Sequence, residues 1–153
     1  MRKRKNLPVG DRSCIVHAAT PSGIVLVRKR QRYSGEVRFW EFPGGKGNNR
    51  DRSPVITAVR EFREETGARL NVADLHLVGS WTEYNHFTHR PFQMYLYVTR
   101  LSAKALEQLV AQSSEGEEVR HFTWIEVEKL IEEGQFSPYH YAKAVSFNVW
   151  RPR

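Results

Sequence analysis

The chain has 153 residues, of which 40% are apolar and 27% are charged, and its formal net charge is +7. These values are typical of a globular protein with one hydrophobic core, and they exclude a membrane-spanning helix, because no apolar run is long enough. One cysteine, Cys14, excludes an intramolecular disulfide. We therefore expect a single domain over residues 1–153, cytoplasmic and without membrane contact, as a monomer or homodimer with a flexible basic tail at residues 1–10.

The positive charge is concentrated in the first part of the chain. Residues 1–60 hold 14 Lys and Arg against 4 Asp and Glu, whereas residues 61–153 hold 10 against 13. A basic surface attracts phosphorylated small molecules and also RNA, so charge alone does not distinguish a nucleotide enzyme from an RNA-binding module.

The first elements predicted along the chain are a hairpin and a short strand. Two runs rich in β-branched residues, 13–20 and 24–29, flank the turn sequence Pro21-Ser22-Gly23. Residues 39–42 alternate apolar and polar side chains until Pro43-Gly44-Gly45, which we expect to end the strand. A polar loop follows over residues 46–52.

A helix is predicted between Ser53 and Gly67. Ser53 is placed to cap the free N–H groups of the first turn, and the missing N–H of Pro54 does little harm at the first helical position. Gly67 ends the helix, since glycine readily adopts the left-handed conformation found there.

The rest of the chain mixes strands and helices. We expect strands at residues 75–81, 92–101 and 120–124, and helices at residues 103–112, 125–133 and 138–149, the last capped by Ser137. The order has no regular βαβ rhythm, which favours an α+β protein, an αβα sandwich around a mixed β-sheet.

The helix after Ser53 has two faces. Helical spacing predicts that Val55, Val59, Phe62 and Thr66 form the buried stripe. Glu61, Glu64 and Glu65 are three or four residues apart, or adjacent, so their carboxylates gather on another face. Three such anions repel one another, and Mg²⁺, which prefers carboxylate oxygens, would relieve the repulsion.

The segment from Gly44-Gly45-Lys46 to Arg60-Glu61-Phe62-Arg63-Glu64-Glu65-Thr66-Gly67-Ala68 resembles the Nudix box. The family pattern is G-x5-E-x7-R-E-U-x-E-E-x-G-U, where U is a bulky aliphatic residue, and its second half matches at every charged and glycine position. Arg52 stands at the position of the first glutamate, and the loop after Gly45 is one residue longer. We therefore expect weakened activity unless the neighbouring Asp51 takes the role of that glutamate.

The resemblance implies a metal site and a set of catalytic residues. Glu61, Glu64 and Glu65 are the implied ligands of Mg²⁺, with Mn²⁺ as a substitute, and Gly44 or Gly45 offers a carbonyl, with Gly45 preferred. Arg60 would hold Glu64 in place. A further carboxylate is expected from Glu115, Glu117 or Glu118. Glu118 is our first choice, as metal ligand or general base, and Glu61 is the other candidate base.

Substrate-binding residues are assigned by position. Arg30 and Lys46 flank the expected phosphate site, and Trp81, Tyr84 and Tyr139 are candidates for stacking on a base. His140 falls roughly where MutT-like relatives carry an asparagine that reads guanine.

The run Trp40-Glu41-Phe42-Pro43-Gly44-Gly45-Lys46 is similar to the MutT branch of this family. The resemblance implies a Mg²⁺-dependent pyrophosphohydrolase that cleaves a nucleoside triphosphate or another nucleoside diphosphate derivative. Two alternatives stay open at this point. One is a hydrolase of ADP-ribose, dinucleoside polyphosphates or RNA 5′ ends. The other is a catalytically impaired module that binds a nucleotide or RNA.

Overall fold

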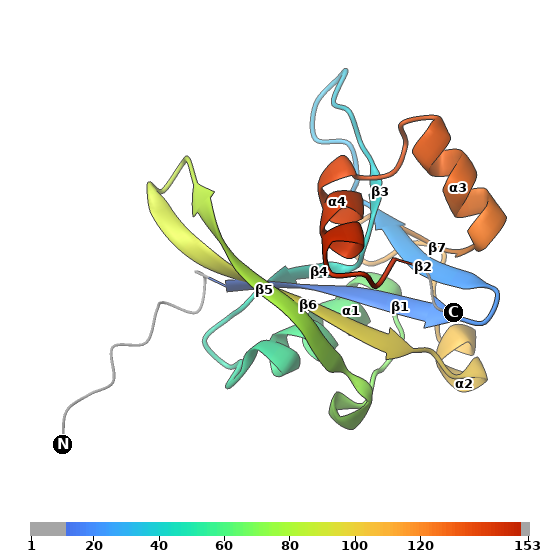
Figure 1. Ribbon diagram of the computed structural model, residues 1–153, viewed down its shortest axis with the longest axis horizontal. Coiled ribbons are helices and arrows are strands. Elements are labelled where there is room, and N and C mark those ends of the chain that lie inside the picture. The colour runs from blue at the N-terminus through green and yellow to red at the C-terminus, as the bar shows by residue number, and fades with distance from the viewer. Residues whose placement is uncertain (1–11, 151–153) are drawn as a thin grey trace.

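A computed structural model describes residues 12–150 and contains one mixed sheet within that part of the chain. The strands run β3-β2-β1-β6-β5 across the sheet, with β4 paired to β1 and β7 to β2 (Figure 1). β1 and β6 are parallel, and the other pairs are antiparallel. The strand bounds are β1 Arg12–Thr20, β2 Gly23–Arg28, β3 Trp40–Glu41, β4 Gly44–Lys46, β5 His76–Asn85, β6 Arg90–Arg100 and β7 Glu118–Thr123.

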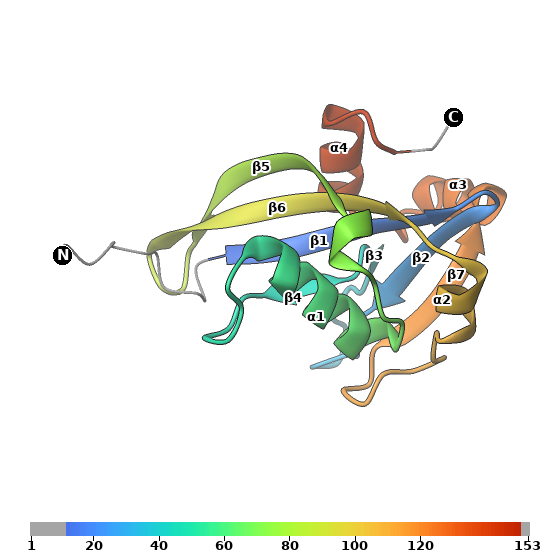
Figure 2. The same cartoon turned by 90° about the horizontal axis from the view of Figure 1, so that it is seen from below.

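Helices cover both sides of this sheet. Figure 2 shows α1 and α2 on one side and α3 and α4 on the other. The bounds are α1 Pro54–Thr66, the short 3₁₀ helix η2 Val72–Asp74, α2 Ala103–Glu107, α3 Trp124–Glu132 and α4 Pro138–Ser146. This arrangement confirms the predicted αβα layers and mixed sheet. No helix within residues 12–150 is long and apolar enough to cross a membrane.

The central strand β1 supplies side chains to a hydrophobic core on each side. Cys14, Val16 and Ala18 pack with Phe62 of α1 in one core, whereas Ile15 and Ala19 belong to the core beneath α3 and α4. Successive side chains of a strand point to opposite faces, so a strand buried on both faces is apolar at nearly every position. This explains the unbroken apolar run from Cys14 to Val16.

The predicted bounds of α1 are confirmed, but the predicted cap is not. Gly67 adopts a φ of 83° and donates its N–H to Arg63 O at the C-terminal end. At the other end Ser53 occupies the cap position, yet its hydroxyl makes no capping hydrogen bond. Of the predicted stripe, Phe62 and Thr66 are buried, whereas Val55 and Val59 are only partly buried. Glu65 is buried as well.

Three other element predictions are corrected by the structure. Gly44 and Gly45 begin β4 instead of ending a strand, because they pair with Ile15 and Cys14. The helix predicted at residues 103–112 ends at Glu107, and Val110 N–H then donates to Thr66 O at the end of α1. The helix predicted at residues 138–149 ends at Ser146. The basic tail expected at residues 1–10 lies outside the described residues.

Candidate active site

In the part of the site formed by the box, β4 lies in close contact with α1. A Cβ atom on Gly45 would lie 2.4 Å from Cδ of Glu61, far inside van der Waals contact. The absence of a side chain at Gly45 therefore lets the Glu61 carboxylate lie against the strand, because an added Cβ would push that carboxylate aside. On the other strand face, a Cβ on Gly44 would lie 2.0 Å from Cys14 O, so the pairing of β4 with β1 depends on this glycine too.

Arg60 donates hydrogen bonds to several acidic residues on and next to α1. Its Nη1 donates to Glu61 Oε1 at 2.9 Å and to Glu64 Oε2 at 3.0 Å. Its Nη2 donates to Asp51 Oδ2 at 2.9 Å and to the carbonyl of Lys46 at 2.7 Å. The expected contact between Arg60 and Glu64 is thus present, and one guanidinium ties three carboxylates to the strand before the loop.

Asp51, and not Arg52, contacts Arg60. Asp51 is buried and also accepts hydrogen bonds from Thr57 Oγ1 at 2.8 Å and Asn48 N–H at 3.0 Å, whereas Arg52 is exposed. Burial would raise the pKa of Asp51, but the hydrogen bonds from Arg60, Thr57 and Asn48 outweigh it and lower the pKa below its usual value. The longer loop after Gly45 therefore presents its acid one residue earlier than the family pattern.

Glu65 points away from the exposed side of α1. It is 3% exposed, and its Oε1 accepts the Gly44 N–H at 2.6 Å. Its Oε2 is in contact with Lys29 Nζ. The same Nζ lies 3.9 Å from Oε1 of Glu117, also buried. The ammonium group of Lys29 thus lies between two buried carboxylates that come from different elements.

Two further glutamates face the same charge. Burial raises the pKa of Glu41 and of Glu61, and the positive charge of Lys29 acts on both in the opposite direction. In the described residues no three Asp, Glu, His or Cys side chains are close enough to hold a metal ion. Instead, Arg60 and Lys29 lie among the carboxylates. The donors are carboxylate oxygens, which suit a hard divalent cation such as Mg²⁺.

The structure brings Glu117 to this cluster, and not Glu118. Glu118 Oε2 accepts a hydrogen bond from Arg28 Nε at 2.6 Å and lies 3.9 Å from Arg38, and the hydrogen bond from Arg28 lowers its pKa. Adjacent residues at the start of a strand point to opposite sides, so one of the two faces Lys29 and the other does not. Glu115 lines the neighbouring cleft.

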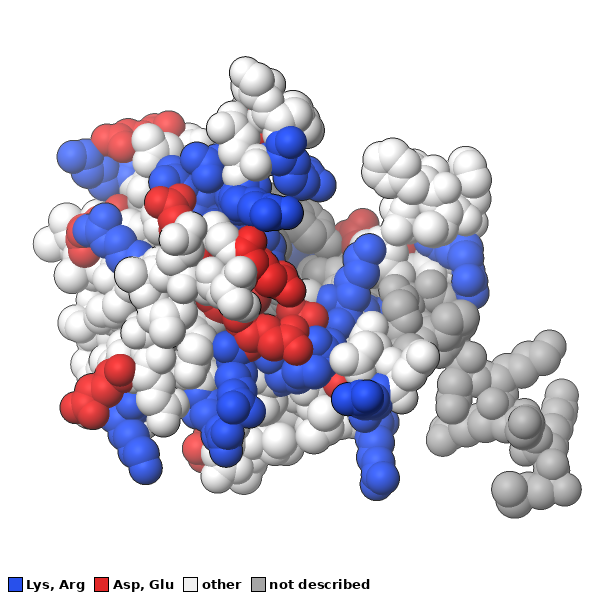
Figure 3. All heavy atoms as spheres, turned by 180° about the vertical axis from the view of Figure 1, so that it is seen from behind, with Lys and Arg blue, Asp and Glu red and all other residues white. Residues whose placement is uncertain are grey.

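That cleft has a volume of about 670 Å³ and carries several basic side chains. Arg30, predicted to bind phosphate, lines it together with Lys29, Arg32, Arg38, Glu36, Glu41, Val37, Phe39, Glu115 and Glu117. Figure 3 shows the molecule from behind, with acidic side chains gathered at the centre and basic side chains around them. The second predicted phosphate ligand, Lys46, is exposed at the end of β4.

Among the predicted stacking residues, Trp81 and Tyr139 lie together. Trp81 Nε1 donates to Tyr139 Oη at 2.6 Å, and Tyr139 Oη donates to Glu83 at 2.5 Å. Lys143 Nζ lies 4.6 Å from the centre of the Trp81 ring. Tyr84 is not part of this group, since its ring contacts His86 and His89 at the β5–β6 turn.

His140 is a buried packing residue. Its ring stacks on Phe42 with centroids 5.4 Å apart, and its Nδ1 accepts the Phe42 N–H at 3.0 Å. Burial lowers the pKa of His140 to about 4, so the ring is neutral at pH 7. The backbone of Phe42 therefore already uses one of the two nitrogens of the His140 ring.

Comparisons with known proteins place this geometry in context. The family model described as NUDIX domain matches residues 10–144. An uncharacterized Nudix hydrolase of Listeria monocytogenes is 24% identical over 148 residues, covering 95% of this chain and 83% of its own length. A solved NUDIX hydrolase from Nitrosomonas europaea has a TM-score of 0.67 at 14% identity, covering 93% of this chain and 88% of that chain. A solved ADP compounds hydrolase has a TM-score of 0.64 at 18% identity, covering 92% and 71%.

Proposed function

Because the chain belongs to the Nudix family and is a hydrolase of phosphorus-containing acid anhydrides, we propose that it cleaves a diphosphate linkage in a nucleoside triphosphate or related nucleotide with Mg²⁺. The observation that carries the proposal is the group of glutamates around Lys29 and Arg60, next to a cleft with basic walls. Acidic groups that would hold a cation and basic groups that would hold phosphates are thus neighbours.

The donor set fits a divalent cation. Glu61, Glu64 and Glu65 of the box would hold it, with Glu117 added from just before β7, and the Gly45 carbonyl would be a further oxygen donor. When bound, the metal would neutralise charge on the phosphate oxygens and make the attacking water more acidic. Mn²⁺ accepts the same oxygen ligands and is expected to substitute.

The residues of the chain supply positioning and the proton acceptor. Arg30 and Lys29 at the cleft would bind phosphate oxygens and orient the substrate. Arg60 fixes Glu61 and Glu64, so the carboxylates keep their places without rearrangement. Glu61 is the better candidate for the base that accepts the water proton, because burial raises its pKa whereas Arg28 lowers that of Glu118.

The aromatic pair Trp81 and Tyr139 is the candidate contact for the nucleoside. Trp81 is partly buried and Tyr139 is 39% exposed, so an edge of the pair remains open to a ligand. The non-catalytic alternative rests on Arg52 and on the basic N-terminal half of the chain. It loses the first of these supports, because Asp51 occupies the place beside Arg60.

The test is turnover of a substrate panel. The full chain would be incubated with Mg²⁺ or Mn²⁺ and with nucleoside triphosphates, ADP-ribose, dinucleoside polyphosphates and a 5′-triphosphorylated RNA. Glu64→Gln is the diagnostic variant, because 52% of this side chain is exposed and its loss leaves the core intact. We expect product from at least one nucleotide and a loss of at least about 10-fold in the variant.

Glu132→Gln is the matched control, since Glu132 is an exposed glutamate of α3 on the other side of the sheet. Its activity should equal that of the unmodified chain. Tight nucleotide binding without turnover under any condition would favour the binding module. Equal activity in the two variants would contradict the assignment of Glu64 to the metal site.

A further inference from the structure

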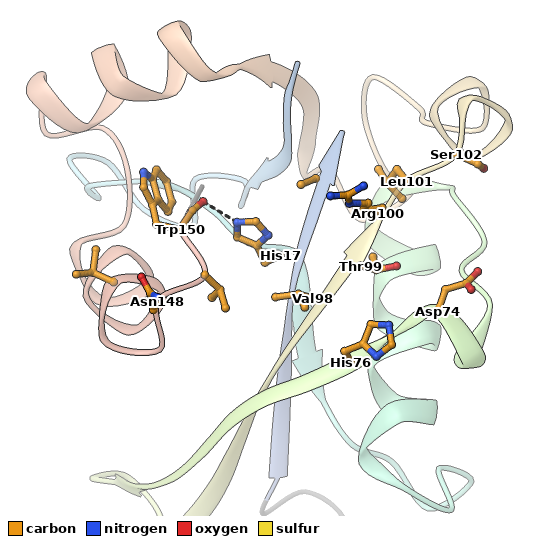
Figure 4. A pocket seen from close by; sticks show the side chains of 13 residues that line it. His17, Asp74, His76, Val98, Thr99, Arg100, Leu101, Ser102, Asn148 and Trp150 are labelled. Carbon is orange, nitrogen blue, oxygen red and sulfur yellow. Dashed lines mark hydrogen bonds between the residues drawn. The ribbon is translucent and has the colours of Figure 1, made fainter. Parts of the chain in front are cut away.

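A second cavity lies at the opposite end of β1 from the acidic cluster. Its volume is about 1220 Å³, and it opens between the ends of β1, β5 and β6 and the segment after α4 (Figure 4). β4 and the box pair with the beginning of β1, at residues 13–15, whereas this cavity is lined by residues 17 and 19 near its end. The cavity is therefore separate from the proposed active site.

The floor of the cavity is a patch of three strands. His17, Val98 and His76 are direct partners across β1, β6 and β5, so their side chains share one face of the sheet. The next row, Ala19 and Arg100, lies on the same face, because it is two residues further along each strand. β5 begins at His76, so this row has no partner in β5.

The wall of the cavity comes from the segment 145–150, all of which lies beyond the residues that match the family model. His17 Nε2 donates to the carbonyl of Trp150 at 2.8 Å, a contact drawn in Figure 4. The Trp150 ring packs against Phe136 and Tyr141. The backbone turns at Asn148, which has a φ of 56°. Trp150 thus holds the wall both to His17 in the floor of the cavity and to the hydrophobic core.

The lining combines apolar surface with one unpaired cation. Six of the thirteen lining residues are apolar: Ala19, Val98, Leu101, Val145, Val149 and Trp150. Arg100 is exposed, and its guanidinium has no hydrogen-bond or ion-pair partner within residues 12–150. The one acidic side chain of the lining, Asp74, comes from η2 and lies across the strand from Arg100 in Figure 4. A single carboxylate does not make a metal site.

We propose that this cavity is a second binding site, for a small organic anion that combines one carboxylate or phosphate group with an apolar ring or chain. Arg100 would bind the anionic group, since a guanidinium offers several donors in one plane to its oxygens. Val98, Ala19 and Val149 would contact the apolar part. Ligand pockets in proteins typically measure about 300–1,000 Å³, so the space accommodates a molecule of that class.

The test is an NMR titration of the full chain labelled with ¹⁵N, in the presence of EDTA. The probes are benzoate and phenyl phosphate, with phenol as the uncharged counterpart. We expect saturable shifts at the backbone amides of Val98, Arg100 and Val149 with both anions, and much weaker ones with phenol. Amides of Lys29 and Gly45 report on the active-site cleft separately. Shifts with one anion alone identify which head group the site accepts.

Two variants test the assignment independently. Arg100→Gln should weaken binding of the anions about 10-fold or more, because hydrogen bonds to charged groups are among the stronger ones. Arg69→Gln, at another exposed arginine, is the matched control and should bind as the unmodified chain does. Val145→Trp starts from a side chain 51% exposed at the wall and should block binding by filling the space.

Three outcomes would overturn the proposal. The first is an absence of shifts at the cavity with either anion, or shifts confined to Lys29 and Gly45. The second is equal affinity of Arg100→Gln and Arg69→Gln. The third is phenol binding as tightly as the anions, which would remove the role of the charge.

Discussion

Lys29 places a positive charge where a bound cation would be needed, and replacing it by methionine tests the site directly. The ammonium group contacts Glu65 and approaches Glu117 at 3.9 Å. Methionine keeps much of the length of the side chain and removes the charge. Glu65 then retains its hydrogen bond from Gly44 N–H at 2.6 Å but loses its cation. We expect two linked effects, on stability without metal and on metal affinity.

The size of the first effect follows from burial. Removing one partner of a fully buried ion pair costs about 3–5 kcal/mol, whereas exposed pairs contribute about 0–1 kcal/mol. The Lys29 side chain is 47% exposed and that of Glu65 is 4% exposed. An intermediate cost of about 1–2 kcal/mol is therefore expected, which corresponds to a fall in Tm of about 2–8 °C for a chain of this size.

The second effect is a gain in metal affinity, and it arises from the same loss of the Lys29 charge. In the unmodified chain a cation has to displace Lys29 from Glu65, whereas in Lys29→Met it does not. The variant should therefore bind Mg²⁺ or Mn²⁺ about 5–30-fold more tightly, the factor that about 1–2 kcal/mol represents. Saturating metal should bring its stability close to that of the unmodified chain.

Thermal unfolding in EDTA and in Mg²⁺, together with calorimetric titration of Mn²⁺, measures both effects. Lys129→Met is the control, because Lys129 is an exposed lysine of α3 that lies 3.9 Å from the exposed Glu133. Lys129→Met should change neither the free energy of unfolding nor that of metal binding by more than a few tenths of a kcal/mol. The reasoning fails if Lys29→Met binds metal no more tightly than the unmodified chain, or if the difference in Tm is the same with and without Mg²⁺.

Three further predictions concern the same region. Gly45→Ala should reduce turnover more than stability, measured by kcat and by Tm, because the added Cβ would lie 2.4 Å from the Glu61 carboxylate. Asp51→Asn should destabilise the chain by about 1–3 kcal/mol at pH 7 in denaturant unfolding. Hydrogen bonds from Arg60 lower the pKa of Asp51 in the folded state, so this difference should shrink as the pH falls below the usual range of an aspartate. His140, whose pKa burial lowers to about 4, should stay neutral in an NMR titration down to about pH 5. The unfolded chain takes up this proton more readily than the folded chain. His140 should therefore lower the free energy of unfolding as the pH falls from about 6.5 to about 4.

Local signals in the sequence predicted the bounds of α1, the first hairpin and the family. Pro54 and Gly67 act through their own backbone dihedrals, so the bounds of α1 could be read without knowledge of the fold. The hairpin of β1 and β2 followed from its turn residues for the same reason. The box pattern identified the family, because its spacing fixes charged residues on one helix. Each of these depends on residues close together in the chain.

The details of the site depend on contacts that the spacing does not specify. Glu65 was grouped with Glu61 and Glu64, yet it turns inward to Gly44 and Lys29, which are 21 and 36 residues earlier. The sequence favours Glu118, but Glu117 is the residue that lies near Lys29, whereas Glu118 pairs with Arg28, because strand register decides which of two adjacent side chains faces the cluster. His140 is held by Phe42, 98 residues away.

The sequence by itself therefore determined that a pair of glycines and an acidic helix belong to one Nudix box, because short-range geometry and a long motif carry that information. Only the tertiary structure decided which acid contacts Arg60, which cation lies between Glu65 and Glu117, and that a second cavity opens beside Arg100. These features arise where distant segments pack together. A carboxylate, unlike a backbone turn, takes its direction and its pKa from whatever the fold places next to it.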